Sequence, residues 1–298
     1  MRSTMVAAAL ILTAPLLAGA QSHQHHASAA VSAIALNQIR DVEQAARSLA
    51  TPDLARAAGF EPTLGWIPMM GTHWVNGPRM LQGKNVTRAE PSQLMFSPVG
   101  GKETLVGVAY AYYAPAKDGE PPVIFDGAPA WHDHPDLAPP GTNLVMLHVW
   151  FVPSPDGPFA GLNPFLPYWA AGVTPPDIDR MHDSATAVRV RTAALALAEI
   201  VDPAGLFPIL ARRPAAKPTL DARRDAIRAV VPQLEAARKA NDLVRWDALL
   251  DTLSEHWNVM RETYIGAALD PNVKTRLAKA IDEMIQGGHA KTGGADAK

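Results

Sequence analysis

The spacing of hydrophobic residues changes twice along the chain, and each change predicts a different kind of secondary structure. From Ala30 to about Ala58, apolar residues recur every three or four positions with polar residues opposite, which predicts a helix. From Phe60 to about Val173, short apolar runs alternate with turns rich in Pro and Gly, which predicts strands. After Thr174 the helical spacing returns and continues to about Ile285. We therefore expect an α+β protein, with an N-terminal helix packed on a β-rich domain, barrel-like or a sandwich, followed by an α-helical C-terminal domain.

The strongest helical pattern lies in the C-terminal region. Seven apolar residues are spaced alternately three and four apart: Leu243, Trp246, Leu250, Leu253, Trp257, Met260 and Tyr264. Such a seam is typical of helices that pair along their length. It would serve either a partner protein or an intramolecular hairpin with the preceding helix, which is predicted from Thr219 to about Ala240. We favour the hairpin, because the preceding helix has apolar residues at matching positions.

The first twenty residues have the pattern of a secretory signal peptide. Arg2 precedes an apolar stretch from Met5 to Leu17, and small residues at Ala18–Ala20 suit cleavage. The stretch is too short to span a membrane, so we expect a periplasmic or secreted protein with no integral membrane segment in its mature chain. The predicted organisation is a signal peptide (1–20), a flexible histidine-containing arm (21–29), the helix plus β-rich domain (30–174), the helical domain (175–287) and a disordered tail (288–298).

Net charge, cysteine content and the absence of certain motifs exclude several classes of binding and catalytic site. The 298 residues carry a formal net charge of −2, which gives no electrostatic basis for binding nucleic acid. The chain contains no cysteine, which excludes disulfides, thiolate metal sites and cysteine nucleophiles. Motifs for a serine nucleophile elbow, a phosphate-binding loop and a zinc-protease helix are also absent.

Two predicted strands each carry a histidine next to aromatic residues. His73 lies in the string from Met70 to Asn76, and His148 lies in the string from Leu147 to Trp150. Neutral imidazoles on facing strands could bind a divalent metal or act as an acid–base pair. Alternatively, each is a structural histidine, and the two then lie at least about 8–10 Å apart, as the strand spacing of a sheet requires. In the functional case they converge on one point.

A third histidine-rich string lies between these strands. His132 and His134 could be further metal ligands, with Asp133 and Asp136 as nearby carboxylates. The neighbouring prolines favour the alternative, a solvated polar loop. The side chains expected to support or wall a site are Trp74, Asn76, Trp131, Asp133, Asp136 and Trp150. Imidazole and carboxylate side chains can bind zinc, copper or iron, so these residues do not identify the metal.

The arm offers a separate copper site. If cleavage follows Ala20, the mature chain begins Gln21-Ser22-His23. A free amine, two deprotonated amides and the His23 imidazole suit square-planar Cu(II). Cyclisation of Gln21 would remove the amine, so we favour a flexible arm that binds metal only adventitiously.

Several strings in a fixed order resemble one family. Met70–Asn76, Leu147–Trp150 and Asp156–Pro164 are similar to strings found in a family of uncharacterised exported bacterial proteins. The resemblance implies an α+β domain with a β-rich core and, in some relatives, oligomerisation; it implies no established reaction. Many relatives have glutamates where this chain has Ala109 and Ser97. Carboxylates that could substitute for them are Glu90, Asp126, Asp133 and Asp136.

Two functions follow from these residues. The first is an exported metal-binding protein with a site around His73 and His148, extending to a small-molecule metalloenzyme. The alternative is a non-catalytic envelope scaffold or assembly protein, a homo-oligomer whose histidines are structural. The expected partners are a metal ion, a small molecule or a second copy of the chain, and not nucleic acid.

Overall fold

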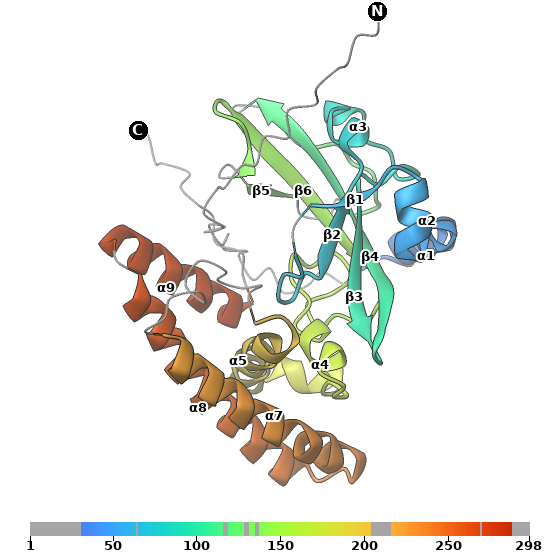
Figure 1. Cartoon of the computed structure of the whole chain (residues 1–298). Helices are drawn as coiled ribbons and strands as arrows, with labels where there is room; N and C mark the ends of the chain where they lie inside the picture. Colours follow the sequence, from blue (N-terminus) through green and yellow to red (C-terminus); the bar gives the residue numbers. More distant parts are fainter. Residues whose placement is uncertain are drawn as a thin grey trace, which may run out of the picture.

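The computed structural model describes residues 31–63, 65–115, 119–127, 131–134, 137–203, 216–268 and 270–287. Within these ranges a single antiparallel sheet lies between two N-terminal helices and the helices of the C-terminal half (Figure 1). The chain is therefore an α+β protein, as its hydrophobic pattern predicts. The expected signal peptide, histidine arm and C-terminal tail lie outside the described residues.

Within the described residues the strands form one open sheet, so the expectation of a barrel-like or sandwich domain is wrong. The strands are β1 (Glu61–Pro62), β2 (Thr72–Val75), β3 (Gln93–Val99), β4 (Lys102–Pro115), β5 (His132–His134) and β6 (Thr142–Trp150). They are hydrogen-bonded in the order β1-β2-β3-β4-β6-β5, and every neighbouring pair is antiparallel. A barrel needs continuous pairing between its first and last strands. Here the edge strands β1 and β5 have two and three residues and pair only with their inner neighbours.

The two faces of the sheet pack against different partners, because alternate residues of a strand point to opposite sides. One face carries large side chains such as Trp74, Leu94 and Val149, which pack on Ile39 and Val42 of α1 (Ala33–Ala46). The other face, which we call the histidine face, carries smaller or more polar side chains. Its members are His73, Val75, Gln93, Met95, Gly107, Ala109, Ala111, Tyr113, His132, His134, Leu144, Met146, His148 and Trp150.

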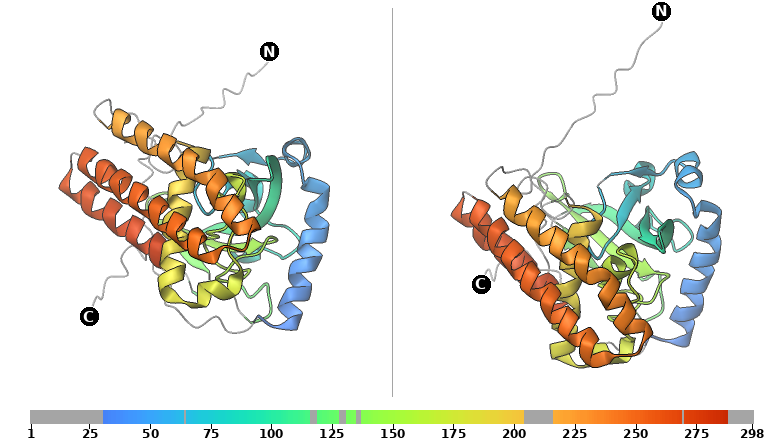
Figure 2. Two further views of the ribbon diagram at one scale, coloured as in Figure 1. Left: turned by 90° about the horizontal axis from the view of Figure 1, so that it is seen from below. Right: turned by 60° about the horizontal axis from the view of Figure 1, so that its bottom comes forward.

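Two short helices, α2 (Pro52–Ala57) and α3 (Gly77–Met80), belong to the N-terminal half, and Ala55 of α2 packs in the same core as α1. The helices of the C-terminal half lie on the other side of the sheet from α1 (Figure 2). They are α4 (Leu166–Ala170), α5 (Ser184–Val201), α7 (Lys217–Lys239), α8 (Leu243–Ala267) and α9 (Pro271–Gln286). Six of the seven seam residues of α8 are buried, and only Leu243 is 39% exposed. They share one core with Ile227 and Leu234 of α7, which confirms the intramolecular hairpin.

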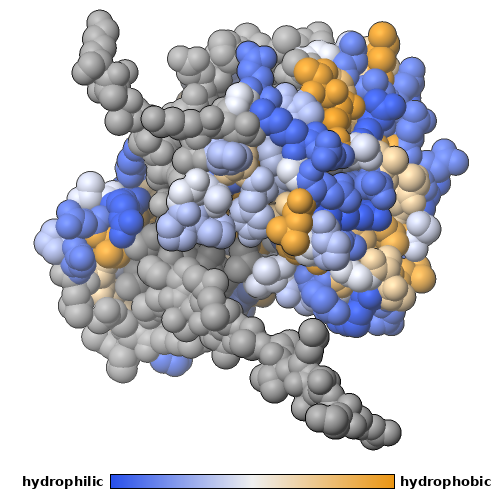
Figure 3. All heavy atoms as spheres, turned by 90° about the horizontal axis from the view of Figure 1, so that it is seen from above, coloured by the Kyte–Doolittle hydropathy of each residue, from blue (hydrophilic) through white to orange (hydrophobic). Residues whose placement is uncertain are grey.

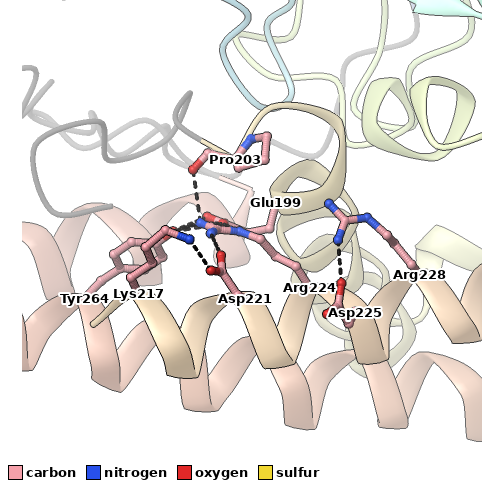
Figure 4. Close-up of polar contacts among 8 residues, drawn as sticks. All are labelled: Glu199, Pro203, Lys217, Asp221, Arg224, Asp225, Arg228 and Tyr264. Atoms are coloured by element: carbon pink, nitrogen blue, oxygen red, sulfur yellow. Dashed lines mark hydrogen bonds and ion pairs between the residues drawn. The ribbon is translucent and has the colours of Figure 1, made fainter. Parts of the chain in front are cut away.

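A buried ionic cluster joins the helices α5, α7 and α8 (Figure 4). The Arg224 guanidinium donates to Glu199 Oε2 over 2.8 and 3.1 Å, to the Tyr264 hydroxyl and to the Pro203 carbonyl. The Tyr264 hydroxyl in turn donates to Glu199 at 2.8 Å. Burial raises the pKa of Glu199, while Arg224 and Tyr264 act in the opposite direction. The cluster is saturated with internal partners, and we assign it a structural role.

One turn of the β-rich part inserts a side chain into the helical core. Met69 is 1% exposed, belongs to the core formed mainly by α5, α7 and α8, and accepts a hydrogen bond from the Asn163 amide. Its φ of 62° is rare for a residue with a Cβ. The turn therefore links the two parts of the molecule directly before β2.

The surface carries its apolar residues in separate patches. In the view from above, apolar residues show as isolated orange areas among blue polar ones (Figure 3). The most exposed large hydrophobic side chains are Val244, Leu81 and Val123. None of the described helices combines the length and hydrophobicity needed to cross a bilayer.

Candidate functional site

Four histidines gather on the histidine face. His73 comes from β2, His148 from β6, and His132 and His134 from the edge strand β5. The His73 and His148 Nε2 atoms are 3.3 Å apart. The His132 ring centroid lies 5.0 Å from that of His148 and 4.9 Å from that of His134. All four side chains are buried, with exposures between 1% and 9%.

The contact between His73 and His148 depends on the shape of the sheet. Strands β3 and β4 lie between β2 and β6, so a flat sheet would separate the two backbones by about 14 Å. The register shifts between Met95 and Phe96 of β3, and such a bulge bends and twists a sheet. The histidine face is consequently concave enough for the two imidazoles to meet across β3 and β4.

Small residues of β4 provide the space beneath the imidazoles. Gly107 is the register neighbour of Met95 and Trp150, and Ala109 is the register neighbour of His148. A Cβ on Gly107 would lie only 2.5 Å from the Val149 carbonyl oxygen. Glycine at this position therefore permits the close approach of β4 and β6.

The turn before β2 fixes the direction of His73. Gly71 has a φ of 75°, and a Cβ there would lie 2.5 Å from the Phe96 carbonyl oxygen. Its amide donates to the Ile67 carbonyl and closes the turn that carries Met69. Because His73 follows two residues later, the anchored turn helps to hold its strand against β3.

The environment keeps His73 neutral. Burial, and after it the nearby His134, lower its pKa from 6.5 to about 4, although a hydrogen bond with the Gly71 backbone acts in the opposite direction. At neutral pH the imidazole is uncharged, which is the protonation state in which histidine binds metals. In a neutral imidazole one ring nitrogen carries the proton, and the other has a lone pair that can coordinate a metal ion.

The expectation that His132 and His134 lie in a solvated loop is wrong. Both are buried, because residues 132–134 pair with β6 as an edge strand. His132 is opposite Met146 and His134 is opposite Leu144, so the alternation of the strand turns both imidazoles inward. Asp133, between them, is exposed on the other side.

Among the predicted wall residues that the structure describes, Trp150 lies beside the histidines. The Trp150 ring centroid is 5.8 Å from that of His148, and its Nε1 donates to the Ala160 carbonyl. Trp74 points to the opposite face, because it is the residue after His73 in a strand. Trp131 packs on Tyr112 of that same opposite face. Asn76 caps α3 by accepting from the Arg79 amide.

The described carboxylates that could substitute for the missing glutamates, Glu90, Asp126 and Asp133, are exposed and do not join the cluster. Asp126 accepts a hydrogen bond from Ser32. Asp136 lies outside the described residues. Of the positions that carry glutamate in the similar family, Ala109 is beside His148, whereas the Ser97 hydroxyl accepts from Trp66 Nε1. Within the described ranges, no group of three or more His, Cys, Asp or Glu side chains is placed to hold a metal ion.

Two other features bear on where a site could lie: the copper ligands predicted at the N-terminus, and a cleft that is separate from the histidine face. Gln21, Ser22 and His23, the proposed N-terminal copper ligands, lie outside the described residues. A cleft of about 210 Å³ opens near the end of β4, lined by Glu43, Arg47, Lys102, Glu103 and Phe151 among others. None of these was a predicted site residue, and none is on the histidine face.

Two groups of residues on the histidine face were not predicted from the sequence: small residues that leave room for the imidazoles, and methionines that place sulfur beside them. Gly107, Ala109 and Ala111 alternate along β4 and all point toward the histidines. A strand with small residues at every second position indicates a face that accommodates larger side chains from its neighbours, and this signal was available. Met95 and Met146, the register neighbours of His73 and His132, required the strand pairing to be known.

Comparison with protein-family models, curated proteins and solved structures finds no match to this chain. The resemblance to the family of exported bacterial proteins therefore stays a prediction, and the function has to be argued from the site itself.

Proposed function

We propose that this chain is an exported metal-binding protein whose histidine cluster holds one transition-metal ion between Nε2 of His73 and Nε2 of His148. The observation that carries the proposal is their separation of 3.3 Å. Two imidazole nitrogens bound to one tetrahedral ion at 2.0–2.1 Å lie about 3.3–3.4 Å apart. Little rearrangement is then needed to bind the ion.

Three further features support this function over a purely structural one. Structural histidines on β2 and β6 were expected to lie apart, and here their ring nitrogens face each other. Burial favours the neutral form of His73, so protons compete weakly with a metal at neutral pH. His132 lies next to His148, and His134 lies next to His132, so two more imidazoles are within reach of small side-chain movements.

Metal binding is better supported than small-molecule catalysis. A substrate would have to reach imidazoles that are at most 9% exposed. The scaffold alternative is less well supported, because the apolar seam of α8, which could have bound a partner protein, packs against α7 of the same chain. Export remains part of the proposal and depends on the N-terminal signal pattern.

The proposal can be tested by elemental analysis of the untagged full chain. His23, His25 and His26 are first replaced by Ala, so that the arm cannot contribute metal. The purified protein is incubated with Zn(II), Cu(II) or Fe(II), desalted and analysed. The test variant is His73→Ala/His148→Ala, and the matched control is His182→Ala/His256→Ala, which removes two histidines outside the cluster.

We expect about one ion per chain in the parent and in the control, and loss of that ion in the test variant. Circular dichroism and thermal unfolding should show that the test variant keeps its fold. No bound metal in the parent, or equal metal in the test variant and the control, would show that the proposed function is wrong.

A further inference from the structure

The side chains nearest the histidine pair in the sheet register include thioethers but no carboxylates. Met95 is directly opposite His73, and Met146 is directly opposite His132. Directly opposed residues of antiparallel strands project from the same face with Cβ atoms about 4.5–5.5 Å apart. Met95 is fully buried, and Met146 is 6% exposed.

The Met95 side chain lies over Gly107 on the histidine face. Its Cε lies 2.6 Å from the position that a Cβ on Gly107 would take, so the side chain crosses from β3 toward β4. The imidazoles of His73 and His148 meet across the same two strands. The thioether therefore lies on the part of the histidine face that the histidine pair spans.

A third buried methionine provides a contrast. Met80 belongs to the same hydrophobic cluster as Met95 and Met146. Its sulfur accepts a hydrogen bond from Gln93 Nε2 at 3.4 Å. Met80 lies on α3 rather than on the sheet and is not a register neighbour of a histidine.

Building on the proposed function, we infer that the bound ion is copper, held in the Cu(I) state by His73, His148 and the thioether of Met95. His132 is beside His148, but no group of three His, Cys, Asp or Glu side chains in the described ranges is placed to hold an ion, whereas Met95 is the buried donor directly opposite His73. Thioether sulfur is a soft ligand that selects Cu(I), whereas zinc and iron in cysteine-free sites favour imidazole and carboxylate. The donor set on this face thus favours copper.

The test compares Cu(I) with Co(II), which replaces Zn(II) as a spectroscopic probe. The full chain with the three arm histidines replaced by Ala is titrated anaerobically with Cu(I) in competition with bicinchoninate. Met95→Leu is the test variant, and Met80→Leu is the matched control for loss of a buried thioether. Leucine has a volume similar to that of methionine, so each variant should keep its fold.

We expect Met95→Leu to bind Cu(I) at least about tenfold more weakly than the parent. Co(II) affinity and the Met80→Leu control should be unchanged. X-ray absorption at the copper edge of the parent should show a sulfur neighbour in addition to nitrogen, and this measurement does not depend on any variant.

Two failures can be told apart. Copper with nitrogen neighbours only, or Met95→Leu with the Cu(I) affinity of the parent, would overturn the thioether ligand while leaving the histidine site in place. Cu(I) and Co(II) affinities that are unaffected in His73→Ala/His148→Ala would overturn the proposed function as well.

Discussion

Gly107→Ala tests whether the approach of β4 and β6 creates the histidine site. The new Cβ would lie 2.5 Å from the Val149 carbonyl oxygen, whereas ordinary contacts begin at 3.4 Å. The strands must therefore separate by about 1 Å, since neither backbone atom can rotate away. Carried to His148, the neighbouring residue on β6, this displacement would increase the Nε2–Nε2 separation from 3.3 Å to about 4.3 Å.

Such a separation is too long for two ligands of one ion, so we expect a loss of metal affinity of at least about tenfold. Overpacking of this kind costs about 1–3 kcal/mol of folding free energy, which a domain of ordinary stability tolerates. Competition titration with Cu(I) and Co(II) measures the affinity, and urea unfolding measures the stability of the same samples.

Gly266→Ala is the matched control. Gly266 is exposed in α8, and a Cβ there would contact nothing within 4 Å. Alanine should stabilise this helix by up to about 1 kcal/mol without affecting the metal. The reasoning is refuted if Gly107→Ala keeps both the metal affinity and the stability of the parent.

Three further predictions concern stability. Arg224→Met leaves Glu199 buried without its cation and should cost about 3–5 kcal/mol in urea unfolding, and adding Glu199→Gln should recover a large part of this. For His73, the folded pKa of about 4 lies below the unfolded value of 6.5, so the unfolded state binds the proton first. The metal-free protein should therefore lose up to about 3 kcal/mol as the pH falls from 6.5 to 4, and His73→Gln should remove this loss. Met69→Ala should cost about 2–5 kcal/mol by leaving a cavity in the helical core. Met69→Gly should be no less stable than Met69→Ala, because glycine relieves the positive φ.

Each of these predictions has a result that contradicts it. An Arg224→Met variant as stable as the parent would mean that Glu199 is accommodated without its cation. A pH profile that His73→Gln leaves unchanged would place the titrating group elsewhere. Met69→Ala with the stability of the parent would show that the turn does not anchor the β-rich part to the helices.

Sequence alone determined the elements whose signals are local. The α8 seam depends on residues within one or two turns of helix, and it occurs as predicted. The strands around His73 and His148 were also predicted, because their apolar runs and flanking turns lie within a few residues. Periodicity reports which face of an element is buried, and it needs no knowledge of the neighbouring elements.

Tertiary structure decided which of these faces meet. Residues 132–134 carry too little local signal for a strand, and pairing with β6 buries both of their histidines. Trp74 and His73 are neighbours in sequence but point to opposite sides of the sheet, so only one of them belongs to the candidate site. The order of the strands, the bulge at Met95 and the absence of a side chain at Gly107 bring His73 to His148. These depend on contacts between residues far apart in the chain, which no window along the sequence contains.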